Sequence, residues 1–194
     1  MEMPVTDQKK IILASRSPRR EHLIHGLDLP VKVIHPPEID ESYPLEMDPI
    51  KVPEYLAVKK SHHFNGRLEP DEILVTADTV VLLHGQIVNK PADLEEARQM
   101  LGRLSGHKHR VITGVCLRSA IKEVTFASHT DVYFSDLNSE EIDYYLAAYK
   151  PLDKAGAYGI QEWIGYIGIE RIEGSFFNVM GLPLHHLYME LKVF

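Results

Sequence analysis

The sequence of 194 residues contains one cysteine and lacks any apolar run long enough to span a membrane. The single cysteine, Cys116, excludes an internal disulfide framework and a cysteine-rich zinc site. Because Cys116 lies in the apolar run 111–117, we expect a buried thiol. Residues 1–4 lack the basic and apolar regions of a signal peptide, so we expect a cytoplasmic protein with no membrane partner.

Positive charge is also in short supply. The chain has 21 basic and 28 acidic residues and a net charge of −7, which argues against nucleic acid as its main partner. The sequence contains no G-x-x-x-x-G-K-S/T loop and no G-x-G-x-x-G run that opens a helix, so the usual nucleotide fingerprints are missing. It has eleven histidines but no H-E-x-x-H motif, and we expect no dedicated histidine–zinc site. A compact anion fits this acidic background better than a long polyanion does.

Hydrophobic residues make up 44% of the chain, enough for one substantial core or two close lobes. Apolar patterning and turn residues predict strands at 10–14, 31–34, 72–83, 86–88, 108–117 and 124–134. Capping residues and prolines predict helices at 18–27, 53–60, 94–101 and 139–148, and from 183 onward. Gly102 is expected to close the third helix, and the glycine-rich segment 150–181 favours strands and tight turns. The alternation indicates an α/β or α+β protein with a mixed sheet.

Two arginines stand where a helix disfavours cations. Ser17 suits an N-cap and Pro18 suits the first helical position, which places Arg19 and Arg20 at the positive end of the helix dipole. The amides of this turn, together with the hydroxyl of Ser15, favour an anion such as a phosphate. The alternative is a solvated basic turn.

Asp78 interrupts the apolar run 73–83, where an unpartnered carboxylate is costly. It therefore suggests acid–base work or cation binding, the alternative being a strand-end aspartate bonded to the amides of Thr79 or Val80. The loop that carries Glu38, Asp40 and Glu41 offers oxygen ligands for magnesium or manganese, although such loops are usually only solvated.

Lys60 and Lys90 each stand where a lysine can meet a phosphate as a point charge. Lone lysines are mostly surface residues, which is the alternative for both.

Several of these segments, in this order along the chain, resemble the Maf family of small cytoplasmic nucleotide pyrophosphatases. The matching stretches are residues 13–20 (LASRSPRR), 77–81 (ADTVV), 90–91 (KP), 104–106 (LSG), 113–115 (TGV), 153–161 (DKAGAYGIQ), 174–175 (GS) and 181–183 (GLP). They cover almost the whole chain, so the resemblance does not rest on a single motif.

The resemblance implies one Maf-like domain over residues 1–194. Its fold would be α/β, with two lobes around an elongated mixed β-sheet and a cleft between the lobes, akin to the inosine triphosphate pyrophosphatases of the Maf/Ham1 type. The implied reaction is hydrolysis of a nucleoside triphosphate between the α and β phosphates, assisted by a divalent metal, Mg²⁺ or Mn²⁺. In the family the aspartate of the A-D-T motif is the proton acceptor, which here is Asp78.

The same resemblance addresses the base. One branch of the family prefers dTTP and UTP, and its markers fall here on Arg19, Thr79 and Gln161. The other branch prefers 7-methyl-GTP and usually carries an aromatic residue and a glutamate at the first and last of these places. All three markers indicate the dTTP/UTP branch. The chain departs from the family at Arg16, where many relatives have a small residue, and at 162–163 (EW), where they often have glycine.

The residues acquire compatible roles within this hypothesis. The metal would be held by Glu38 or Glu41 together with Asp78. Phosphate oxygens would be bound by five side chains, those of Ser15, Arg19, Arg20, Lys60 and Lys90. Gln161 has the donor and the acceptor needed to contact a pyrimidine edge.

Three matters stay open at this point. A 7-methyl-GTP pyrophosphatase of the same family is one alternative. A non-catalytic nucleotide-binding regulator of cell division is another, although it fits an intact Asp78 and Lys90 less well. The oligomeric state is undetermined, with a homodimer as one candidate.

Overall fold

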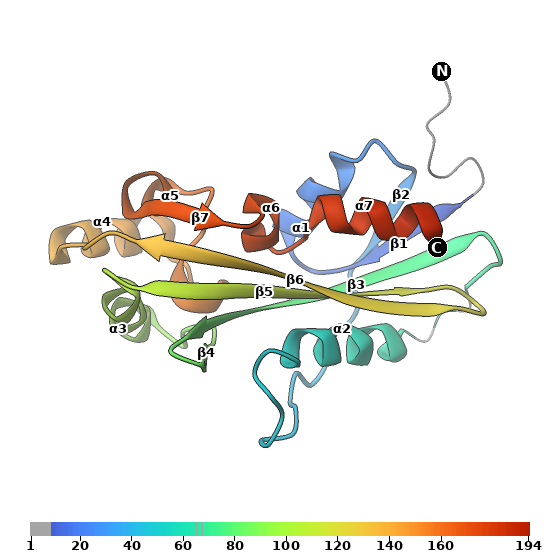
Figure 1. Cartoon of the computed structure of the whole chain (residues 1–194), viewed down its shortest axis with the longest axis horizontal. Coiled ribbons are helices and arrows are strands. Elements are labelled where there is room, and N and C mark those ends of the chain that lie inside the picture. The colour runs from blue at the N-terminus through green and yellow to red at the C-terminus, as the bar shows by residue number, and fades with distance from the viewer. Residues whose placement is uncertain (1–8, 65, 67) are drawn as a thin grey trace. The chain divides into compact units, whose positions relative to one another are not determined.

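The computed structural model describes residues 9–64, 66 and 68–194 (Figure 1). The strands form a seven-stranded sheet in the order β2-β1-β3-β5-β6-β7, with β4 beside β3. β1 (Lys10–Ala14) pairs in parallel with β2 (Val31–Ile34) and β3 (Glu72–Leu83), whereas β3 and β4 (Gln86–Val88) are antiparallel. The predicted α/β class with a mixed sheet is therefore confirmed. Residues 1–4, on which the expected cytoplasmic location rests, lie outside the described residues.

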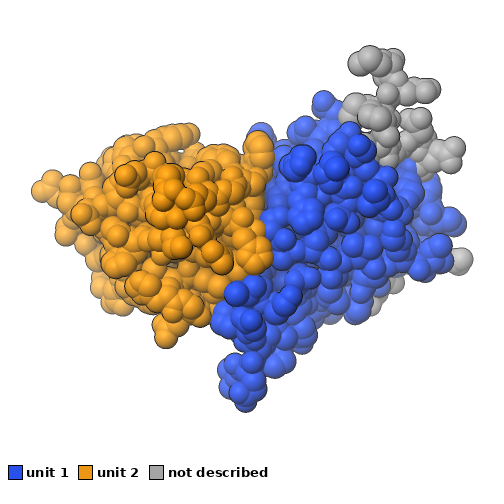
Figure 2. All heavy atoms as spheres, viewed as in Figure 1, with its two compact units in different colours: residues 1–78, 113–128, 181–194 blue, residues 79–112, 129–180 orange. Residues whose placement is uncertain are grey.

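The remaining strands are β5 (Lys108–Arg118), β6 (Glu123–Phe134) and β7 (Ile169–Glu173), and β6 and β7 pair in antiparallel orientation. The chain divides into two compact units, shown in Figure 2. Unit 1 comprises residues 1–78, 113–128 and 181–194, and unit 2 comprises residues 79–112 and 129–180. β3, β5 and β6 each contribute residues to both units, and the division within β3 falls directly after Asp78.

Unit 1 contains the helices α1 (Pro18–His25), α2 (Val52–His63) and α7 (Leu184–Val193). Figure 1 shows α2 and α7 on opposite sides of the strands. α2 lies close to them: Thr76 Oγ1 donates to the carbonyl of Ala57 at 2.7 Å. A Cβ at Gly114 would meet the backbone of α2 within 2.3 Å, so only glycine permits this approach. The close packing matters because α2 also carries Lys60.

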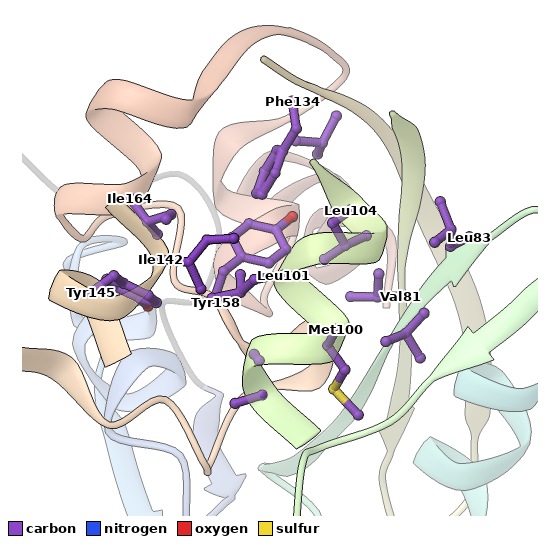
Figure 3. Packing of buried hydrophobic residues seen from close by; sticks show 14 of the residues in the cluster. Val81, Leu83, Met100, Leu101, Leu104, Phe134, Ile142, Tyr145, Tyr158 and Ile164 are labelled. Carbon is purple, nitrogen blue, oxygen red and sulfur yellow. The ribbon is translucent and has the colours of Figure 1, made fainter. Parts of the chain in front are cut away.

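Unit 2 has its own core, seen in Figure 3. Its helical elements are α3 (Leu94–Leu104), α4 (Ser139–Tyr149), the 3₁₀ turn η1 (Ala155–Ala157), α5 (Trp163–Gly168) and α6 (Phe176–Met180). α4 begins with the predicted capping box, in which Asn138 and Glu141 bind each other's backbone amides. The core residues labelled in Figure 3 are Val81, Leu83, Met100, Leu101, Leu104, Phe134, Ile142, Tyr145, Tyr158 and Ile164.

Three predicted helix boundaries or segments need correction. α1 ends at His25 rather than at Leu27, with Gly26 at its C-cap. The prediction that Gly102 closes α3 is wrong, because the helix continues to Leu104, whose side chain is fully buried. Burial of a leucine is worth roughly 1.5–3 kcal/mol, which outweighs the cost of about 1 kcal/mol for glycine inside a helix.

The prediction of strands and tight turns over residues 150–181 is confirmed for β7 and for the 3₁₀ turn η1, and wrong for the helices α5 and α6. At Gly165, inside α5, an added Cβ would lie 1.9 Å from the carbonyl oxygen of Ile160. The glycine there reflects a close approach between backbones, which composition does not distinguish from a turn.

His109 is 2% exposed in unit 2, with Nε2 at 2.7 Å from the hydroxyl of Tyr158. Burial lowers the pKa of His109 to about 4, against smaller opposing effects from the His107 backbone and Asp131. Between pH 6.5, the ordinary value, and pH 4 the unfolded chain therefore binds more protons than the folded chain does. We expect this group to make stability fall as the pH is lowered through that window, by up to about 1.4 kcal/mol per pH unit.

Urea unfolding of the wild type and of His109→Gln at several pH values from neutral to acidic measures this effect, because glutamine keeps a polar contact with Tyr158 but does not titrate. The variant should lose less stability on acidification. Equal losses in the two proteins would contradict the assignment.

Candidate functional site

The turn between β1 and α1 has the predicted helix start. Ser17 caps α1 in an extended conformation, its hydroxyl accepts from the amide of Arg20 at 3.4 Å, and Pro18 follows in the first turn. The hydroxyl of Ser15, a buried residue, accepts from the amide of Ser17 at 3.1 Å. The two hydroxyls therefore hold the shape of the turn from which Arg19 and Arg20 extend. A phosphate-binding role for Ser15 and Arg19 stays a prediction.

Arg20 connects three parts of unit 1. Its Nε donates to the carbonyl of Gly181 at 2.7 Å, and its Nη1 donates to the carbonyl of Ala77 at 2.9 Å. Burial lowers the pKa of Arg20, and the nearby Asp78 carboxylate acts in the opposite direction. Sequence reasoning assigned Arg20 to a phosphate and missed this contribution to the fold, which links residues 161 positions apart.

Asp78 lies in the middle of β3 and is paired with a lysine. Lys60 Nζ lies 2.5 Å from Asp78 Oδ1 and 2.8 Å from Glu41 Oε1. The side chains of Asp78 and Lys60 are 10% and 18% exposed, whereas that of Glu41 is 45% exposed. The alternative of a strand-end aspartate is wrong, because β3 continues to Leu83. Asp78 and Glu41, both selected from the sequence, thus contact the ammonium group of Lys60, which was selected as well. The cluster holds two negative charges and one positive charge.

The acidic loop divides among three basic residues. Glu38 lies 3.9 Å from Arg16 Nη1, and its side chain is 92% exposed. Asp40 lies 3.2 Å from Lys59 Nζ, and Ser42 followed by Lys59 lowers the pKa of Asp40 to about 2. Glu41 alone of the three contacts Lys60 among the ion pairs of the described residues. The loop therefore does not act as one carboxylate cluster.

The other predicted residues belong to unit 2. Thr79 follows Asp78 in β3, and Lys90 is exposed in the segment between β4 and α3. Gln161 is half-buried directly before the N-cap of α5, and its backbone carbonyl accepts from the hydroxyl of Tyr166 at 3.0 Å. Its side-chain Oε1 is buried and has no hydrogen-bond partner in the described part of the chain. A ligand donor would satisfy this acceptor.

Sequence reasoning missed a buried polar network beside Gln161. The Glu162 carboxylate accepts from the hydroxyl of Tyr145 and lies 3.2 Å from Lys154 Nζ. Lys154 belongs to the motif stretch 153–161, and Glu162 is one of the departures from the family pattern. Those two signals mark the residues, but their contact with Tyr145 depends on how α4 packs.

The side chains that could hold a divalent metal can be identified by their donor groups. Among residues 9–64, 66 and 68–194, no three His, Cys, Asp or Glu side chains are grouped to hold a metal ion. Two carboxylates, those of Asp78 and Glu41, contact the same Lys60 ammonium group. Mg²⁺ commonly uses one or two carboxylates and completes its shell with substrate phosphates and water, so the pair fits a metal that enters with a nucleotide. None of the described helices is long and apolar enough to cross a membrane.

The fold is similar to that of a HAM1 protein from Coxiella burnetii, with a TM-score of 0.52 and 15% identity over 96% of this chain and 100% of that chain. The family model described as Maf-like protein matches residues 10–194, and the chain belongs to the Maf family. A relative from Phocaeicola vulgatus named dTTP/UTP pyrophosphatase is 50% identical over 186 residues, 96% of each chain. One of the same name from Porphyromonas gingivalis (strain ATCC 33277) is 53% identical over 187 residues, 95% of this chain and 94% of the relative.

Proposed function

We propose that this chain is a nucleoside triphosphate pyrophosphatase that hydrolyses dTTP and UTP to the monophosphate and pyrophosphate. The observation that carries the proposal is the identity of 50% and 53%, over nearly the full length, to relatives named for that activity. All three branch markers, Arg19, Thr79 and Gln161, agree with it. This identity places the chain as a hydrolase rather than as a non-catalytic regulator.

The proposed chemistry starts at Asp78. A water molecule attacks the α phosphorus, the Asp78 carboxylate takes its proton, and the bond from the α phosphorus to the bridging oxygen breaks with release of pyrophosphate. Lys60 lies within 2.5 Å of that carboxylate and presents a positive charge to the incoming triphosphate. Phosphate contacts from Ser15, Arg19, Arg20 and Lys90 are part of the proposal and rest on the family resemblance.

The divalent metal is proposed to be held by Asp78 and Glu41. These are the carboxylates that meet at Lys60, whereas Glu38 is 92% exposed beside Arg16. When bound, the metal supplies positive charge that stabilises the pyrophosphate leaving group. The sequence left Glu38 and Glu41 as equal alternatives, and the ion pairs favour Glu41.

The base is proposed to be recognised by the side chain of Gln161. Uracil and thymine carry a donor at N3 between two acceptor oxygens, which suits an amide that offers both an acceptor and a donor. Cytosine has an acceptor at N3 and an amino donor beside it. With the buried Oε1 of Gln161 turned to N3, the amide would favour uracil and thymine, because cytosine presents a lone pair there.

The proposal also includes predictions about domain organisation, location, partners and oligomeric state that only the sequence supports. They are a single domain with a nucleotide cleft, a cytoplasmic location, the absence of a nucleic-acid or membrane partner, and a homodimer as one oligomeric state.

Removal of divalent cations with EDTA is expected to abolish dTTP hydrolysis, and added Mg²⁺ or Mn²⁺ to restore it, because the metal would offset the negative charge of the two carboxylates and the triphosphate. Glu41→Gln should raise the Mg²⁺ concentration for half-maximal rate by at least about tenfold, because one of the two proposed carboxylate ligands is lost. Glu38→Gln is the matched control and should leave that concentration unchanged. The reverse pattern would move the metal ligand to Glu38.

Pyrophosphate and monophosphate release from dTTP, UTP, CTP and 7-methyl-GTP with Mg²⁺ tests the function directly. We expect dTTP and UTP to be the fastest substrates, with pyrophosphate rather than orthophosphate as the product. Faster turnover of 7-methyl-GTP would overturn the substrate. Nucleotide binding without turnover of any of the four would support the non-catalytic alternative and overturn the enzyme.

A further inference from the structure

Gln161 stands at the end of a loop that is closed by a buried ion pair. The loop runs from Asp153 to Glu162, and the Glu162 carboxylate at its end lies 3.2 Å from Lys154 Nζ at its beginning. The side chains of Lys154 and Glu162 are only 10% and 17% exposed. Buried charges of this kind are costly unless they are paired and hydrogen-bonded, so the position of both side chains is closely determined.

Tyr145 connects this ion pair to α4. Its hydroxyl donates to Glu162 Oε2 and accepts from the amide of Gly159 at 3.0 Å. Tyr145 is fully buried in the core of unit 2, near Ile142 and Ile164 in Figure 3. Burial, reinforced by Glu162, raises the pKa of Tyr145, which keeps the hydroxyl protonated and able to donate. The loop is therefore bound to a rigid part of the core.

The loop backbone is shaped for the Glu162 carboxylate. A Cβ at Gly159 would lie 2.7 Å from Glu162 Cδ, so a larger residue there would displace the Glu162 carboxylate from its present position. The amide of Glu162 donates to the carbonyl of Gly159 at 3.0 Å. Glu162 is also the N-cap of α5, yet in the described structure its side chain makes no capping hydrogen bond. The carboxylate serves the network with Tyr145 and Lys154 instead of the helix end.

The network fixes the position of the Gln161 backbone. Gln161 precedes Glu162, and its own carbonyl is bound by the Tyr166 hydroxyl at 3.0 Å. The Gln161 side chain therefore extends from a fixed backbone. Its buried Oε1 has no hydrogen-bond donor within the described residues. A buried acceptor left unsatisfied destabilises the structure, and a ligand donor removes that cost.

We propose that Glu162, Lys154 and Tyr145 are positioning residues for base selection: they hold the Gln161 amide where it accepts from N3–H of uracil or thymine and excludes cytosine. This inference rests on the proposed function, and it deepens it by naming residues that act through Gln161. Preorganisation of this kind acts on discrimination because, with the amide oxygen held at N3, cytosine meets it with a lone pair instead of a donor, whereas an amide free to turn over would pair with the amino group and N3 of cytosine as well.

The test compares kcat/KM for UTP and CTP in Glu162→Gln, Tyr145→Phe and Gln161→Ala. Glu162→Gln keeps an acceptor for Tyr145, and Lys154 keeps its ion pair with Asp153 at 2.7 Å, so this variant is expected to fold. We expect its UTP-to-CTP ratio to fall about tenfold, mainly through KM for UTP. In the Gln161→Ala background, Glu162→Gln should change the ratio no further, because its effect passes through Gln161.

The control is Glu141→Ala, which removes a cap of α4 and leaves the contacts of Glu162 in place. It should lower Tm without changing the ratio. An unchanged ratio in Glu162→Gln, or an equal fall with and without Gln161, would overturn the proposal and leave the network a structural role. Calorimetric binding of UMP and CMP to the same variants gives the same comparison without turnover. A wild type that does not hydrolyse UTP would therefore refute the enzyme separately from the positioning role.

Discussion

Replacing Asp78 by asparagine is expected to lower kcat for dTTP and UTP hydrolysis by about 10²- to 10⁴-fold, the range typical of a lost general base. Asparagine has nearly the same size but cannot accept the proton from the attacking water. It also removes one of the two carboxylates that meet at Lys60, so it weakens metal binding as well. Steady-state pyrophosphate release at saturating Mg²⁺ separates the loss of the base from the loss of metal affinity.

The control for this variant is thermal unfolding of the same preparation. Lys60 keeps its contact with Glu41 at 2.8 Å, so the variant should remain folded. An Asp78→Asn protein that keeps its wild-type kcat at saturating metal would remove Asp78 from the role of base. Loss of activity that Mg²⁺ fully restores would leave Asp78 as a metal ligand alone.

Arg20→Met is expected to destabilise the fold by about 3 kcal/mol or more, because a hydrogen bond from a charged donor is worth roughly 1.5–3 kcal/mol and two are lost. The carbonyls of Ala77 and Gly181 would both lose their guanidinium donor. Asp78, which follows Ala77, would also lose a nearby positive charge. The midpoint of urea unfolding measures the effect.

Two comparisons define the role of Arg20. Arg19→Met removes the same charge from the same helical turn but leaves the bonds to Ala77 and Gly181 intact, so it should cost much less stability. Arg20→Lys keeps the charge but replaces the planar guanidinium by a single ammonium group. It should therefore show most of the loss of stability expected for Arg20→Met. Equal midpoints for Arg20→Met and the wild type would show that these two bonds do not contribute to folding.

Local features of the fold could be read from the sequence. The strand at Glu72–Leu83 and the helix start at Ser17 and Pro18 were predicted with their observed bounds. A β-branched apolar run and a capping serine followed by proline depend on neighbouring residues only. The end of α3 was not predictable in this way, because Leu104 is held in the helix by its burial in unit 2.

The candidate site divides along the same line. Asp78 was marked by its charge inside an apolar run, and the acidic loop by its composition. Which loop carboxylate shares Lys60 with Asp78 could not be inferred, since Glu38, Asp40 and Glu41 differ in their partners only after the chain is folded. The bond from Arg20 to Gly181 and the bond from Tyr145 to Glu162 could not be inferred for the same reason, because they too form only in the folded chain.

The sequence by itself therefore determined the residue types, the order of the motifs and the family, because these depend on chemistry along the chain. Tertiary structure alone decided that Lys60 joins Asp78 to Glu41, that Arg20 supports the fold, and that Glu162 turns away from its helix. The physical reason is that an ion pair or a buried hydrogen bond requires two groups within about 3 Å, and only packing brings distant positions that close.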